Sequence, residues 1–267
     1  GVARMMNILV IGDSCKDVFI YGETVRLSPE APVPVLNPLT EISNDGMAKN
    51  VVNNVESLQA NVHSITNKNS IRKIRYVDEK SNQLVLRVDE HDYCERILKE
   101  DLTRVKNNIH FVMGNTIEID AIIVSDYCKG FLEEDDIQFI CENNNNVFVD
   151  TKKKLGDWIN STTYIKINSI EYKENKSFFK DNSIMDKTIV TKGNKGCLFQ
   201  GKIYPTEDVR VKDISGAGDT FLAGLVVEYV KTNDIIKAIS FAQECTEIVV
   251  QKHGVSVVTK EDIKDYE

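Results

Sequence analysis

A short glycine-rich run near residue 216 has the side chains and spacing best suited to chemistry in this sequence. Ser215-Gly216-Ala217-Gly218 stands directly ahead of Asp219 and of an apolar segment, 221–230, with the composition of a helix. Glycine lets the backbone approach a ligand closely, and the free N–H groups and dipole of a helix start favour an anion. A carboxylate there suits removal of a proton from a hydroxyl group that attacks a phosphoryl group. The same residues are equally compatible with a simple turn in which Asp219 caps the helix.

The composition is typical of one large α/β domain and disfavours several other classes of protein. The chain has 267 residues, 42% of them hydrophobic, and a formal net charge of −8, which argues against a broad nucleic-acid-binding surface. Its six scattered cysteines form no C-x-x-C pair, as is typical of reduced thiols in the cytoplasm. No apolar run is long enough to cross a membrane. We therefore expect a cytoplasmic protein with small-molecule ligands and neither a nucleic-acid nor a membrane partner.

The elements that must position the glycine-rich run alternate along the chain. Short apolar runs predict strands at 7–11, 62–65, 121–124, 147–150, 164–167 and 188–192. Amphipathic or apolar stretches predict helices at 47–58, 95–108, 133–143, 216–231 and 234–252. This alternation indicates a mostly parallel central sheet with helices on both faces.

Two stretches do not fit the alternation and predict a small β-lid over one end of the sheet, formed from about 18–40 and 71–90. The segment 26–36 holds three of the five prolines, which suits an extended edge segment. Alternating residues at 71–77 and 83–89 predict a hairpin. Arg72, Arg75 and Arg87 lie on it; their default role is a solvated face, and their alternative role is to meet a phosphate.

Three motifs resemble a known family. Asp213-Ile-Ser-Gly-Ala-Gly-Asp-Thr220 is similar to the signature of ribokinase-type (PfkB) carbohydrate kinases. Leu27-Ser-Pro-Glu-Ala-Pro-Val-Pro-Val35 and Val124-Ser-Asp-Tyr-Cys-Lys-Gly130 resemble the subgroup that phosphorylates D-glycero-β-D-manno-heptose 7-phosphate. The resemblance implies a ribokinase-like three-layer sandwich and one kinase domain over residues 1–267. Because an exposed edge of the β-lid invites pairing, we also expect a homodimer formed through the lid. The resemblance also implies transfer of the γ-phosphoryl group of ATP to the anomeric hydroxyl, with Mg²⁺ and K⁺ as candidate cations.

The resemblance further implies roles for individual residues. Asp219 would be the general base, and Gly216, Ala217 and Gly218 would donate N–H groups to the transferred phosphoryl. The expected nucleotide-binding residues are Asn168, Glu171, Thr191, Gly193, Gly196, Lys252, His253 and Gly254, of which Asn168 and Glu171 would also place Mg²⁺ indirectly. The expected substrate-binding residues are Asp13, Asp17, Arg26, Gly46, Asn50, Asp126 and Lys129. Among these, Arg26 and Lys129 are candidates by charge alone, for a sugar phosphate.

Two departures from the family pattern keep other functions open. The family's Gly-Gly pair is Gly46-Met47 here, and the chain passes almost directly from Ile65 to Ile71, where relatives carry a further helix and strand. The alternatives are a kinase for another sugar, sugar phosphate or nucleoside, and a pseudokinase that binds nucleotide without turnover.

Overall fold

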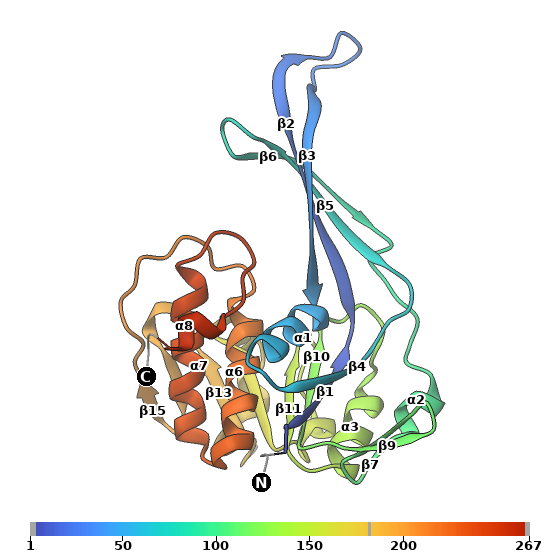
Figure 1. Ribbon diagram of the computed structural model, residues 1–267, viewed down its shortest axis with the longest axis vertical. Coiled ribbons are helices and arrows are strands. Elements are labelled where there is room, and N and C mark those ends of the chain that lie inside the picture. The colour runs from blue at the N-terminus through green and yellow to red at the C-terminus, as the bar shows by residue number, and fades with distance from the viewer. Residues whose placement is uncertain (1–3, 181–182, 265–267) are drawn as a thin grey trace.

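A mostly parallel sheet forms the centre of the protein (Figure 1). The computed structural model describes residues 4–180 and 183–264, and within these ranges eight strands follow the order β15-β14-β13-β12-β11-β10-β1-β4. Six neighbouring strands of this sheet, β4, β1, β10, β11, β12 and β13, are parallel, and β14 and β15 are antiparallel. Their bounds are β1 (Asn7–Gly12), β4 (Asn61–Thr66), β10 (Ala121–Asp126), β11 (Val147–Thr151), β12 (Tyr164–Asn168), β13 (Thr188–Thr191), β14 (Cys197–Phe199) and β15 (Lys202–Tyr204).

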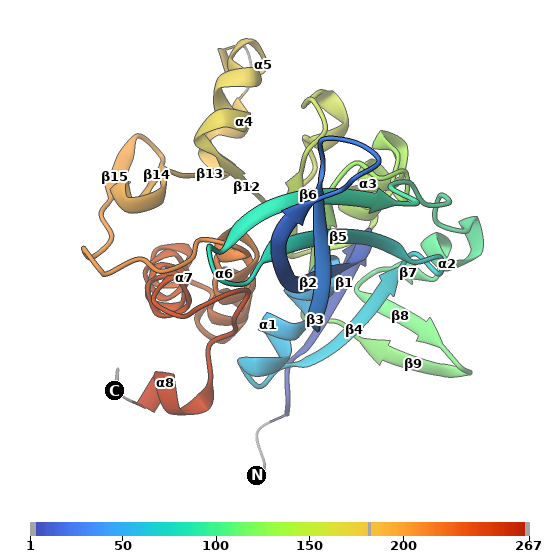
Figure 2. The ribbon, with the colours of Figure 1, turned by 90° about the horizontal axis from the view of Figure 1, so that it is seen from above.

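Helices cover both faces of this sheet, so the expected three layers are confirmed (Figure 2). One face packs against α1 (Ala48–Ser57), α6 (Ala217–Thr232) and α7 (Ile235–Val250). The other face packs against α3 (Glu134–Asn143), α5 (Lys176–Lys180) and the 3₁₀ turns η1 (Asp157–Ile159) and η2 (Ser183–Lys187). The middle strands are apolar along their length because parallel strands are buried on both sides; the side chains of 8–11 and 121–124 are wholly buried.

The lid is a second sheet that stands above the carboxyl ends of the central strands (Figure 1). It contains β2 (Ser14–Leu27), β3 (Pro34–Met47), β5 (Ile71–Asp78) and β6 (Gln83–Glu90), in the order β3-β2-β5-β6. The lid therefore begins earlier and extends further than the ranges 18–40 and 71–90. The four prolines of the lid fall at its tip and in β3, an edge strand that tolerates a missing N–H group.

One predicted helix is wrong. Residues 95–108 contain only the short α2 (Lys99–Thr103), and the chain then forms a small sheet of β7 (Val105–Lys106), β8 (Ile109–Val112) and β9 (Asn115–Glu118). Asn107 and Asn108 both adopt φ of 55°, which is the left-handed pair that a tight hairpin requires and a helix excludes.

The short connection after β4 has a structural consequence. Only 67–70 link β4 to β5, and in the described part of the chain no strand pairs with the outer edge of β4. The remaining short elements are α4 (Ser169–Glu174), η3 (Gly193–Lys195) and α8 (Lys260–Lys264). The six cysteines are free thiols. No helix among the described residues combines the length and the apolarity that a membrane crossing needs.

Candidate active site

A cleft of about 530 Å³ lies between the lid and the carboxyl ends of the central strands, where open parallel sheets bind their ligands. Its walls come from three places: the lid, the strand ends of β11 to β13, and the start of α6. The sequence-predicted residues that line it are Asp17, Gly46, Asn50, Asn168, Thr191, Gly216, Ala217, Gly218 and Asp219, together with the hairpin residue Arg75. Residues that are far apart in the sequence therefore meet in one cavity.

Asp219 occupies the first turn of α6, directly after the glycine turn. Gly216 has φ of 75°, the left-handed conformation that glycine adopts without strain. The Asp219 carboxylate is 5% exposed and accepts hydrogen bonds from Asn50 Nδ2 and from the Tyr127 hydroxyl, both at 2.8 Å. Burial raises the pKa of Asp219 to about 6, although these two hydrogen bonds oppose the shift. A carboxylate with a pKa near neutral pH is well suited to act as a general base.

The lid forms the opposite wall of the cleft and presents both signs of charge. Arg75 Nη1 lies 2.8 Å from Asp17 Oδ1, and its guanidinium stands 5.2 Å from the centre of the Phe19 ring. Lys73, on the same strand, also lines the cleft. A Cβ at Gly46 would lie 2.4 Å from Asp17 Oδ2 and 2.6 Å from Cys15 Sγ, so a larger residue there would displace these side chains.

A smaller cavity of about 120 Å³ adjoins the cleft and shares Thr191, Ala217 and Gly218 with it. Gly193 and Gly196, both with positive φ, line this second cavity, and Gln243 closes it from α7. Ala217 and Gly218, which are predicted from the sequence to donate N–H groups to a phosphoryl group, therefore border both the cleft and a second pocket that no lid residue lines.

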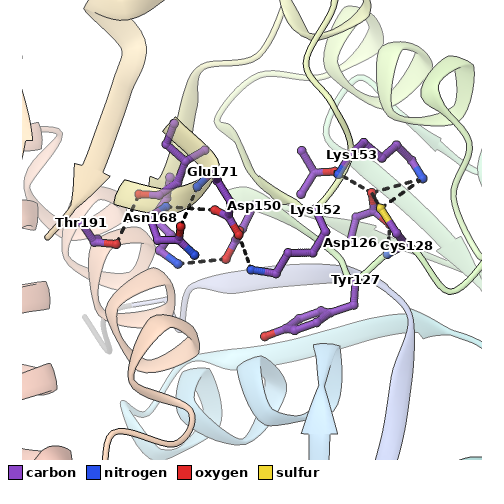
Figure 3. Close-up of polar contacts among 12 residues, drawn as sticks. Asp126, Tyr127, Cys128, Asp150, Lys152, Lys153, Asn168, Glu171 and Thr191 are labelled. Atoms are coloured by element: carbon purple, nitrogen blue, oxygen red, sulfur yellow. Dashed lines mark hydrogen bonds and ion pairs between the residues drawn. The ribbon is translucent and has the colours of Figure 1, made fainter. Parts of the chain in front are cut away.

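Asn168 and Glu171 form a reciprocal cap at the start of α4. Asn168 Oδ1 accepts from the Glu171 N–H, and Glu171 Oε2 accepts from the Asn168 N–H, both at 2.9 Å. Glu171 Oε1 pairs with Lys152 Nζ, and Figure 3 shows these residues gathered beside Asp150. Asn168 lines the cleft, whereas Glu171 lies behind it.

Several sequence-predicted residues are not brought into the cleft. Asp13 is wholly buried and accepts from the backbone N–H groups of Tyr127 and Lys129, both at 2.7 Å, so it fixes the loop after β10. Lys129 Nζ pairs with Asp92, and Arg26 is exposed near the lid tip.

Asp126 and the predicted residues that follow α7 also lie outside the cleft. Asp126 accepts from the Thr151 hydroxyl at 2.6 Å and pairs with Lys153, in a group that Figure 3 shows apart from Glu171. Lys252 pairs with Asp262. His253 and Gly254 are exposed and do not line the cleft, although the next residue, Val255, does.

Sequence reasoning missed Tyr127 and a buried ion pair. Lys166 is 5% exposed, and its Nζ lies 3.1 Å from Asp150 Oδ2. The signal for Lys166 was present: a lysine in the middle of an apolar parallel strand, Tyr-Ile-Lys-Ile-Asn, is almost never buried unless it is paired. Tyr127 gave no such signal, because its contact with Asp219 joins two distant parts of the chain.

Oxygen donors suited to Mg²⁺ are present at this edge of the sheet. In residues 4–180 and 183–264, no group of three or more histidine, cysteine or acidic side chains is arranged to hold a metal ion. However, Asp150 Oδ1 is a buried carboxylate oxygen with no hydrogen-bond partner among the described residues, and Asp150 lines the cleft. A cation held by one carboxylate together with a nucleotide's phosphates fits this donor set.

Comparison with known proteins identifies relatives of both sequence and fold. Residues 56–262 match the profile described as pfkB family carbohydrate kinase. The bifunctional protein HldE of Helicobacter pylori (strain J99 / ATCC 700824) is 31% identical over 308 residues, which cover 97% of this chain and 66% of the relative. HldE of a Nitratiruptor species is 31% identical over 307 residues, covering 98% and 65%. The chain thus spans just under two thirds of the length of these curated relatives.

Solved structures show the same fold at low identity. Ribokinase from Thermotoga maritima superposes with a TM-score of 0.72 at 16% identity, covering 98% of this chain and 99% of that one. Phosphofructokinase-2 from Escherichia coli gives a TM-score of 0.70 at 10% identity, covering 98% and 97%. The central sheet, its two helical layers and the lid therefore form a ribokinase-like architecture.

Proposed function

This chain belongs to the pfkB family of carbohydrate kinases, and on that premise we propose that it transfers the γ-phosphoryl group of ATP to a hydroxyl group of a sugar phosphate. The observation that carries the proposal is the position of Asp219. Its buried carboxylate shares one cleft with Asp17 on the lid side and Asn168 on the nucleotide side.

The geometry supports a direct transfer assisted by a general base. Asp219 takes the proton of the acceptor hydroxyl as that oxygen attacks the γ-phosphorus, and the bond to the β,γ-bridging oxygen of ATP breaks. The N–H groups at the start of α6 stabilise the charge on the transferred phosphoryl. Mg²⁺, when bound with ATP, neutralises charge on the phosphate oxygens. The lid excludes water, which would otherwise compete as acceptor.

The proposed acceptor is D-glycero-β-D-manno-heptose 7-phosphate, phosphorylated on its anomeric hydroxyl to the 1,7-bisphosphate. Similarity to the HldE proteins over 97% of the chain supports this choice. The lid contributes Lys73 and Arg75 to the cleft wall, and these cations suit an acceptor that itself bears a phosphate.

A different sugar phosphate is the second candidate acceptor. Met47 lines the cleft at the N-cap of α1, with φ of 58°. The family pattern has a second glycine at this position, so the cleft wall beside Gly46 carries a larger side chain here. A bulkier wall at this point would favour a smaller acceptor.

The proposal includes a homodimer formed through the lid. Lid side chains that are more than half exposed include Val25, Leu27, Leu39, Leu84 and Leu86. An apolar group of this kind on a projecting sheet favours burial against a second copy. Light scattering coupled to size exclusion tests the dimer: two chains per particle are expected, and a monomer at micromolar concentration would contradict it.

Turnover of a substrate panel tests the function. The wild-type protein is assayed for ADP release with ATP, Mg²⁺ and, in turn, heptose 7-phosphate, other sugar phosphates, free sugars and nucleosides, each in K⁺ and in Na⁺. We expect the highest kcat/KM with heptose 7-phosphate. ATP binding without acceptor-dependent ADP release across the whole panel would instead indicate a pseudokinase.

A further inference from the structure

A groove lined by four lysines lies beside α4, outside the site described above. It has a volume of about 490 Å³, and its basic residues are Lys173, Lys176, Lys192 and Lys195. It shares no lining residue with the cleft or with the smaller cavity. Of the described residues that line it, none is acidic. The groove is therefore positively charged on a chain whose formal net charge is −8.

The groove and the smaller cavity lie on opposite faces of β13. Successive residues of a strand point to opposite faces of a sheet, and Val190 lines the groove whereas Thr191 lines the cavity. Figure 2 shows the same division, with α4 and α5 on one side of β12 and β13, and α6 and α7 on the other. The turn after β13 divides likewise, because Gly193 lines the cavity whereas Lys192 and Lys195 line the groove. These two lysines therefore belong to a surface that is separate from the proposed nucleotide pocket.

The four ammonium groups of the groove have no partners of opposite charge. In residues 4–180 and 183–264, none of them forms an ion pair. Lysines at the neighbouring strand ends differ, since Lys152 pairs with Glu171 and Lys166 pairs with Asp150. Four like charges that share one groove repel one another. A bound anion would remove that repulsion.

The lysines form two pairs on two walls of the groove. Lys173 lies in the last turn of α4, and Lys176 is the first residue of α5. Lys192 and Lys195 stand at the two ends of the turn η3, where the Lys195 N–H donates to the Lys192 carbonyl at 3.2 Å. Two phosphate groups together carry a charge of about −3 to −4 at pH 7. This charge matches the four ammonium groups, with one phosphate group for each pair.

The lining between the two pairs is apolar and offers one free hydroxyl group. Val190 is wholly buried there, and the Tyr172 ring packs on Phe179 with 5.2 Å between the ring centres. The Tyr172 hydroxyl forms no hydrogen bond with any described residue, so it is available to donate to a ligand oxygen. An apolar surface between two pairs of cations suits a carbon skeleton that joins two phosphate groups.

We propose that this groove is a second ligand site, which takes a small organic molecule with two phosphate groups, one at each pair of lysines. The proposal goes beyond phosphoryl transfer and does not depend on it. A nucleic acid is a less suitable occupant, because a long polyanion would also face the remaining surface of an acidic chain. Lysine binds phosphate as a point charge, so the site selects its ligand by the number and spacing of its charges.

Calorimetry with fructose 1,6-bisphosphate as the probe tests this site. The protein is first saturated with Mg²⁺ and the non-hydrolysable analogue AMP-PNP, so that the proposed nucleotide pocket is filled. We expect the bisphosphate to bind at least about tenfold more tightly than inorganic phosphate, because its second phosphate group reaches the second pair of lysines. The double variants Lys173→Met, Lys176→Met and Lys192→Met, Lys195→Met should each weaken binding of the bisphosphate about tenfold or more. Both should keep the wild-type affinity for AMP-PNP.

The matched control is the double variant Lys99→Met, Lys237→Met. Both residues are exposed and neither lines the groove, so the same change in net charge should leave the affinity for the bisphosphate unaltered. Thermal unfolding followed by circular dichroism checks that every variant is folded.

Four results would overturn the proposal. The bisphosphate could fail to bind at millimolar concentration, or the control could weaken its binding as much as the groove variants do. The groove variants could lose affinity for AMP-PNP in parallel, which would assign the lysines to the nucleotide. A short single-stranded oligonucleotide could bind more tightly than the bisphosphate through the same lysines. Failure to phosphorylate any sugar would refute the proposed function alone, because this test measures only binding.

Discussion

Replacing Asp219 by asparagine should remove activity while relieving a cost to folding. The carboxylate is 5% exposed, and burial raises its pKa from 3.8 to about 6. At about 1.4 kcal/mol per pKa unit, ionising it in the folded protein costs about 3 kcal/mol more than in the unfolded chain. Asparagine keeps the shape of the protonated acid and cannot ionise. The loss of the base should lower kcat by about 10²- to 10⁴-fold.

The sign of the pH dependence follows from the raised pKa. Below about pH 3 the carboxyl group is mostly protonated in both the folded and the unfolded states, so burial carries almost no ionic cost. As the pH rises from about 4 through 6, the unfolded chain ionises first and the folded state loses relative stability. The free energy of unfolding of the wild type, minus that of Asp219→Asn, should therefore fall by about 3 kcal/mol between pH 3 and pH 7.

Urea denaturation of both proteins across this pH range measures the difference between their free energies of unfolding. The contributions of the other titrating groups largely cancel in this difference, because both proteins contain them. The pH profile of kcat/KM for the wild type should show an acidic limb near pH 6, since Asp219 must be ionised to accept a proton. A difference that stays flat, or that rises with pH, would mean that the group has an ordinary or lowered pKa. The assignment of a buried base would then fail.

Three further substitutions probe the contacts around this base. Tyr127→Phe removes a hydrogen bond that lowers the pKa of Asp219, so the acidic limb of kcat/KM should shift to higher pH. An unshifted limb would show that this hydrogen bond does not set the pKa of the base. Gly46→Ala places a methyl group against Asp17, so KM for the acceptor should rise at least tenfold while AMP-PNP binding measured by calorimetry stays the same. Lys73→Met should raise KM for a phosphorylated acceptor by about tenfold or more and leave KM for the corresponding free sugar unchanged, and an equal loss for both would contradict a phosphate-binding role.

The matched control for the last substitution is Arg72→Met. This residue precedes Lys73 on β5 and pairs with Glu90 instead of lining the cleft. The substitution Arg72→Met removes one positive charge from the same strand as Lys73→Met does. An equal effect of the two substitutions would therefore indicate general electrostatic attraction and not a specific contact.

The sequence was sufficient where local chemistry determines structure. Buried runs such as 121–124 identified parallel strands, and the glycine run identified the start of α6, because both depend on neighbours in the chain. It was insufficient for residues 95–108, where the left-handed conformation of Asn107 and Asn108 replaced an expected helix by a hairpin. Asparagine tolerates both conformations, and packing decides between them.

The candidate site divides in the same way. Asp17, Asn50 and Asp219 could be chosen from motifs, and they meet in the cleft. Asp13 had the right residue type and strand position, but its carboxylate turns inward to the loop after β10. The strand around Lys166 indicates that this lysine is paired, but its partner Asp150 lies in another strand, so no single stretch of sequence identifies the pair. Long-range pairing therefore limited the assignment of side chains more than the assignment of elements.

Transfer of label from [γ-³²P]ATP to heptose 7-phosphate, followed for the wild-type protein and for Asp219→Asn, tests the central claim most directly. The account predicts a labelled sugar bisphosphate with the wild type, and loss of at least a hundredfold in the variant while AMP-PNP affinity is retained. Equal transfer by the two proteins, with the variant correctly folded, would contradict it.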